Sequence, residues 1–154
     1  GSISKTSNDI SIGYLAGSTT ASSGGGAVSI GQNANQGTTT IGFNSIAIGT
    51  SSKSVSTNTI SIGNQAGNST GSISAESISI GYNSNFGTAA IGLRSIAIGS
   101  ESKARTVNGI AIGTNTLVSQ TSTGTPNNIA IGVNAIALGD FSLAIGGNTI
   151  AETT

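Results

Sequence analysis

The sequence predicts an all-β fold, a parallel β-solenoid in which short strands stack coil upon coil, and three observations predict it. A tetrad ending in Ile-Gly, or once in Leu-Gly, occurs twelve times along the chain. The spacings between successive tetrads begin 18, 11, 7 and 14, and this series then repeats unchanged, which gives a superperiod of 50 residues. The third residue after every tetrad glycine is Ala, Ser or Thr. Repeats this short are stable only when each one stacks on its neighbours.

Composition excludes a conventional globular core. The chain of 154 residues has three Phe and two Tyr, and 6% of it is charged. Without a pattern, so much Ser, Thr, Asn and Gly would indicate disorder. The repeat therefore decides the fold class.

Each tetrad predicts a three-residue strand. In Φ-x-Ile the two large apolar side chains lie on one face of the strand and a Ser or Ala lies on the other. We expect the apolar face to form ladders that fill a narrow, dry interior. The predicted core residues are Ile12, Ile30, Ile41, Ile48, Ile62, Ile80, Ile91, Ile98, Ile112, Ile131, Leu138 and Ile145.

The glycine after each strand predicts an immediate turn, because glycine adopts backbone conformations that β-branched residues resist. The turn glycines are Gly13, Gly31, Gly42, Gly49, Gly63, Gly81, Gly92, Gly99, Gly113, Gly132, Gly139 and Gly146. The small residue three positions later indicates steric confinement. These positions are Ala16, Ala34, Ser45, Ser52, Ala66, Ser84, Ser95, Ser102, Thr116, Ala135, Ser142 and Thr149.

Two seven-residue units predict one flattened coil of about 14 residues with two sheets. Spacings of 18 and 11 then each carry four extra residues, which predicts loops on a common edge. We expect one repetitive domain over 3–151, with superrepeats at about 10–60, 60–110 and 110–150 and a tail at 152–154. Residues 1–2 are typical of a cloning remnant, and the chain is interpreted as a fragment whose secretion signal and anchor lie elsewhere.

Three copies of the repeat, at residues 45–49, 95–99 and 135–139, resemble the Ser-Val/Ile-Ala-Ile-Gly repeats in head domains of trimeric autotransporter adhesins of the Yersinia adhesin A type. The resemblance implies a left-handed β-roll, a side-by-side homotrimer, and attachment to a host matrix protein, receptor or glycan. It also implies a cell-surface location. The copies at Gly13, Gly63 and Gly81 are similar to repeats of phage and large-virus tail fibres, which leaves a receptor-binding or spacer segment on a virion as the alternative.

Trimerisation also has a physical argument, because a thin roll buries little apolar area and small side chains permit close approach of a neighbour. The candidates for that contact are the residues between the strand's apolar positions, and the alternative is that they face solvent. They are Ser11, Ala47, Ser61, Ser79, Ala97, Ala111, Ala130, Ala137 and Ala144.

Catalysis is not expected. The chain has no His and no Cys, so the nucleophile arrangements that need them are excluded, and its five carboxylates are scattered. No cofactor and no metal site is predicted. A net charge of zero argues against nucleic acid as a partner. No apolar run reaches the roughly 20 residues that cross a bilayer, so direct membrane insertion is not expected.

Ligand contacts are predicted on three loops, at Gly17–Ala27, Gly67–Ser77 and Thr114–Asn128, because repeat proteins carry variable contacts on insertions. The single residues predicted to face a ligand are Arg94, Lys103, Arg105, Tyr14 and Tyr82. The alternatives are solvated spacer loops, an inter-subunit ion pair and coil-end packing. A passive shaft and an ice-binding solenoid remain open as other functions, although ice binding favours ranks of Thr where this repeat carries Ser and Ala.

Overall fold

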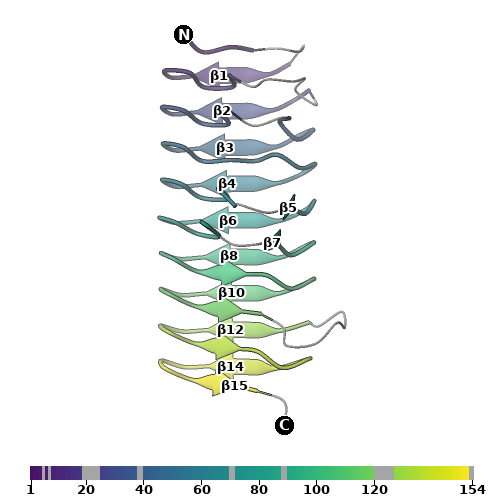
Figure 1. Ribbon diagram of the computed structural model, residues 1–154, viewed down its shortest axis with the longest axis vertical. Helices are drawn as coiled ribbons and strands as arrows, with labels where there is room; N and C mark the ends of the chain where they lie inside the picture. The colour runs from purple at the N-terminus through teal and green to yellow at the C-terminus, as the bar shows by residue number, and fades with distance from the viewer. Residues whose placement is uncertain are drawn as a thin grey trace.

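The chain is a parallel β-solenoid, seen here in a computed structural model that describes residues 1–4, 6, 8–18, 25–37, 40–69, 72–87, 90–119 and 127–152. The described residues form short strands and no helix. Figure 1 shows the strands stacked as rungs along the long axis, with the two termini at opposite ends. The all-β solenoid that the repeat predicts is therefore confirmed.

Nine strands form one parallel sheet, with one strand from each successive coil. Paired residues lie 14 residues apart in three of the eight pairs, 18 apart in four and 19 apart in one. These separations confirm the predicted 14-residue coil and its four-residue extension. The strands are β1 (Ile10–Ile12), β2 (Val28–Ile30), β3 (Ile46–Ile48), β4 (Ile60–Ile62), β6 (Ile78–Ile80), β8 (Ile96–Ile98), β10 (Ile110–Ile112), β12 (Ile129–Ile131) and β14 (Leu143–Ile145).

The return segments of the coils form a second layer with two smaller parallel sheets. One contains β9 (Lys103–Ala104), β11 (Leu117–Val118), β13 (Ile136–Ala137) and β15 (Ile150–Ala151), and the other contains β5 (Ser72–Ile73) and β7 (Ala90–Ile91). The strands of this layer have two residues each, so most of the fold's regular pairing lies in the nine-stranded sheet.

Two of the predicted loops are partly wrong because they contain strands. Within Gly67–Ser77, β5 pairs with β7. Within Thr114–Asn128, β11 pairs with both β9 and β13. The chain continues to stack there because the backbone finds its partners in the neighbouring coils. The centres of the three predicted loops, at 19–24, 70–71 and 120–126, lie outside the described residues, so their predicted ligand contacts stay a prediction.

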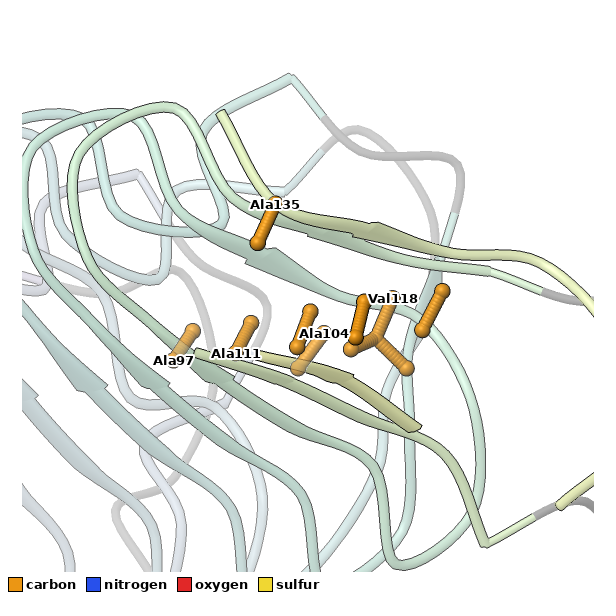
Figure 2. Close-up of a cluster of buried hydrophobic side chains, with 8 residues drawn as sticks. Ala97, Ala104, Ala111, Val118 and Ala135 are labelled. Carbon is orange, nitrogen blue, oxygen red and sulfur yellow. The ribbon is translucent and has the colours of Figure 1, made fainter. Parts of the chain in front are cut away.

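The interior of the roll is lined by small side chains. The middle residue of each strand from β2 to β14 in the large sheet is an Ala or Ser with at most 3% of its surface exposed. Figure 2 shows Ala97 and Ala111 of that sheet facing the space between the layers, with Ala104 and Val118 on the other side of it. The prediction that these middle residues form the intermolecular contact is therefore wrong, since they point inward; only Ser11 of β1 is partly exposed.

The predicted Ile core is correspondingly wrong for most of its members. Ile12, Ile98, Ile131 and Ile145 are 57, 37, 37 and 62% exposed. A further set is only half-buried in the single chain: Ile30, Ile48, Ile62, Ile80, Ile112 and Leu138. Ile41 and Ile91, which lie on the second layer, are buried as predicted, at 4 and 1% exposure.

The reason for this inversion is that the interior is one small side chain thick. The hydroxyl of Ser54, on the second layer, donates to the carbonyl of Ile46 on β3 at 2.7 Å. From the opposite layer, the hydroxyl of Ser61 donates to the carbonyl of Lys53 at 2.7 Å. A serine side chain is therefore long enough to reach from one layer to the backbone of the other. The space between the layers is then too narrow for Ile side chains that face each other.

Nine turn glycines form a vertical column with φ between +117° and +133°. Within this column a Cβ on Gly81 would lie 2.5 Å from the carbonyl oxygen of Gly99 in the next coil, so both the conformation and the space require glycine. Gly42, Gly92 and Gly139 do not have a positive φ, and the prediction of a special turn conformation is wrong for them. A Cβ on Gly42 or Gly92 would instead collide with the backbone of Ser56 or Thr106.

The small position three residues after the glycine is confined as predicted. Ten of the twelve are buried, and Ser142 and Thr149, in the last coils, are partly exposed.

Candidate interaction surface

A double column of aliphatic side chains runs along the outer face of the nine-stranded sheet. The in-register pairing places equivalent residues of successive strands directly above one another. We call these two columns the apolar ladder. The first column is Ile10, Val28, Ile46, Ile60, Ile78, Ile96, Ile110, Ile129 and Leu143; the second is Ile12, Ile30, Ile48, Ile62, Ile80, Ile98, Ile112, Ile131 and Ile145.

The apolar ladder is long and unbroken. Nine strands at about 4.8 Å spacing extend about 40 Å, and residues two apart in a strand are separated by about 7 Å. Every position in both columns is Ile, Leu or Val. A continuous apolar strip on the order of 300 Å² lies within the range of the largest patches on ordinary monomers, and such patches are often functional.

Polar turns border the ladder on both sides. On the edge where the strands end, the side-chain amide of Asn115 donates to Asn134 at 3.0 Å, and that of Asn134 donates to Asn148 at 2.9 Å. On the edge where they begin, the Nε of Arg94 donates to Asn108 at 3.1 Å and the amide of Asn108 donates to Asn127 at 2.7 Å. An apolar centre with a polar rim is the usual anatomy of a protein interface.

The structure does not bring the five predicted ligand-facing residues together. Tyr14 and Tyr82, 63 and 55% exposed, follow turn glycines on one edge, whereas Arg94 lies in a turn on the opposite edge. Lys103 and Arg105 lie in and beside β9, on the second layer. The five residues therefore do not form one site.

Lys103 instead lines a hollow of about 200 Å³ together with Asn83, Phe86 and Glu101. The sequence analysis singled out Lys103 of this set and missed the hollow. The available signal was the superperiod, which places Asn33, Gln36, Ser51 and Lys53 at the equivalent positions 50 residues earlier.

Two further findings concern chemistry and membranes. No group of three or more His, Cys, Asp or Glu side chains that could hold a metal ion occurs among the described residues. In the same part of the chain, no helix is long and apolar enough to cross a bilayer.

Comparison with known proteins gives one match. The family model described as YadA head domain repeat (2 copies) matches residues 41–66, 90–116 and 129–149, just under half of the chain. These segments contain β3, β4 and most of the strands from β7 to β14, so the matched repeats are coils of this solenoid. Neither a curated protein nor a solved structure gives a match.

Proposed function

We propose that this chain, whose coils carry YadA head domain repeats, is a non-catalytic head or shaft segment of a trimeric surface adhesin. In this proposal three left-handed rolls lie side by side, and their apolar ladders face one another around a common axis. The segment is displayed at the cell surface and is anchored through a region outside it. The observation that carries the proposal is the unbroken apolar ladder, and the family match supports the same reading.

Burial of the ladder contributes to association. At about 25 cal/mol per Å², covering an apolar strip on the order of 300 Å² contributes about 7–8 kcal/mol per chain. This is of the same order as the roughly 4–15 kcal/mol that association costs in lost translational and rotational freedom, so the ladder offsets a large part of that cost.

The proposed interface consists of the large aliphatic residues of the ladder. The sequence analysis had instead expected the small middle residues of the strands to form it, and those residues fill the interior. The proposed interface leaves the second layer and both turn edges exposed. These surfaces are available to a host matrix protein, a cell-surface receptor or a glycan.

The oligomeric state tests the interface. Light scattering of the purified chain should give about three times the chain mass of 14.8 kDa. Ile62→Lys, in the centre of the ladder, should yield a folded chain of single mass, because three ammonium groups would be desolvated at the axis. Asn64→Lys, two residues away in the exposed turn, is the matched control and should remain trimeric. A wild-type monomer, or an Ile62→Lys variant that stays trimeric, would contradict the proposed interface.

Attachment is tested separately. The trimer should bind immobilised matrix proteins or host cells, with binding that saturates and that soluble trimer competes away. A trimer that binds none of them would favour the passive shaft over the adhesive head.

A further inference from the structure

The hollow beside Lys103 has polar groups without partners. Within the described residues, no hydrogen bond or ion pair engages the side chain of Asn83, Glu101 or Lys103. The side-chain oxygen of Asn83 is buried without a donor, and so is that of Asn33 at the equivalent position of the first superrepeat, so this oxygen does not distinguish the hollow. The carboxylate of Glu101, the ammonium of Lys103 and the side-chain N–H groups of Asn83 are the groups available to a bound molecule.

The backbone beneath the hollow is fixed. Asn83 and Glu101 occupy the same turn position in successive coils, with φ of +53° and +60°. The amide of Glu101 donates to the carbonyl of Tyr82 at 2.9 Å, that of Phe86 to Asn83 at 3.0 Å, and that of Lys103 to Thr116 at 2.8 Å. Side chains mounted on a fixed backbone lose less freedom when a ligand binds.

The four side chains form a chemically mixed set. Phe86, 38% exposed, offers an aromatic face with negative potential, which attracts polarised C–H groups. Glu101 accepts hydrogen bonds, whereas Lys103 and the side-chain N–H groups of Asn83 donate them. A pyranose ring presents the complementary pattern, with a C–H face for the ring of Phe86 and hydroxyls that both donate and accept.

We propose that this hollow binds a single pyranose residue of a glycan, with Phe86 stacked on its C–H face and Asn83, Glu101 and Lys103 hydrogen-bonded to its hydroxyls. The inference rests on the proposed attachment function and names the ligand class of one site within it. Lys103 lies on the second layer, so the hollow stays accessible when the apolar ladder is covered. One carboxylate is too few for a cation site, which distinguishes this hollow from a calcium site.

The superperiod supplies a natural comparison within the same chain. At the equivalent hollow position in the first superrepeat, Gln36 and Ser51 replace Phe86 and Glu101, while an Asn and a Lys are kept. The backbone is equivalent, since the amide of Ser51 donates to the carbonyl of Gln32 at 2.9 Å and Ser51 has a φ of +56°. Of the first two superrepeats, only the second therefore has an aromatic ring and a carboxylate at these positions.

The test is an NMR titration of the intact chain, following the side-chain amide of Asn83, with the methyl glycosides of glucose, galactose, mannose and N-acetylglucosamine as probes. At least one should bind saturably, with a dissociation constant on the order of 1 mM, as expected for a ligand of this size. Phe86→Gln and Glu101→Ser place the residues of the first superrepeat in the hollow, and each should weaken binding at least about tenfold. The double change Gln36→Phe with Ser51→Glu should add a second site of similar affinity.

The proposal is overturned if none of the four glycosides shifts the Asn83 amide saturably, or if Phe86→Gln binds as the wild type does. Mass measurement on the same samples separates the two proposals. A trimer without sugar binding overturns the hollow alone, and a monomer that binds sugar overturns the trimeric interface alone.

Discussion

At the residue scale, the column of turn glycines combines two constraints. In all but the last of these glycines the backbone of one coil lies against the backbone of the next, and the left-handed φ adds a second reason for glycine. The residue two positions after each of these nine glycines also has a positive φ, between +53° and +60°. Five of those nine residues are Asn, the side chain best suited to that conformation after glycine.

Two glycines of one coil compare a stacked turn position with an open one. Gly81→Ala should destabilise the chain by about 3 kcal/mol or more, because its Cβ would lie 2.5 Å from a backbone oxygen that cannot move without the whole coil. Gly87→Ala, which has a φ of +62° but no atom within 4 Å of the added Cβ, should cost only about 1 kcal/mol. Chemical unfolding of both variants measures the difference. Equal losses would mean that neither the stacked backbone nor the φ of +130° at Gly81 adds to the ordinary cost of a positive φ.

At the scale of the strand, the inversion of the apolar pattern has a direct consequence. Ala97 of β8 is fully buried between the layers, whereas its neighbour Ile98 is 37% exposed. Ala97→Leu should therefore destabilise the roll by about 2–3 kcal/mol through overpacking. Ile98→Leu, a change of shape at nearly constant volume, should cost less than about 1 kcal/mol. The midpoints of thermal unfolding distinguish the two, and equal tolerance would place the small side chain outside the packed interior.

The same strand shows how far sequence reasoning reaches. The tetrad predicts that Ile96 and Ile98 share one face and that Ala97 lies on the other, and the structure has this alternation. Which face is inside depends on the distance between the two layers. The alternation of residues within one strand carries no information about that distance. The general rule that large apolar side chains are buried selected the wrong face, because the interior beneath the nine-stranded sheet is lined mostly by Ala and Ser. Larger side chains such as Ile91 and Asn85 are buried at a few other positions.

The candidate site was harder to predict for a related reason. Phe86 and Lys103 are separated by 17 residues, and they meet at one hollow because an 18-residue coil lies between β6 and β8. Lys103 was singled out as one of a local group of charged residues, with Lys53 at the equivalent position one superperiod earlier. Its partners become recognisable only after the coil length has placed them in register.

At the scale of the whole molecule, the coils make nearly identical hydrogen bonds but differ in how many coils lie on either side of them. The amides of Gly31, Gly81 and Gly146 each donate to a carbonyl of the preceding coil at 2.8 Å. Gly81 lies near the middle of the nine-stranded sheet, whereas Gly31 and Gly146 lie one coil from its first strand and in its last coil. In a solenoid each coil is stabilised mainly by its two neighbours, so a coil near an end can open without disrupting the rest.

Amide hydrogen exchange should therefore follow position in the stack and not bond geometry. We expect the amide of Gly81 to exchange at least about tenfold more slowly than those of Gly31 and Gly146 in the 154-residue chain. The Ile62→Lys variant, measured beside the wild type, shows how much of this protection comes from association. Uniform protection along the stack in that variant would mean that a single roll opens as one cooperative unit and that its coils are not independent neighbours.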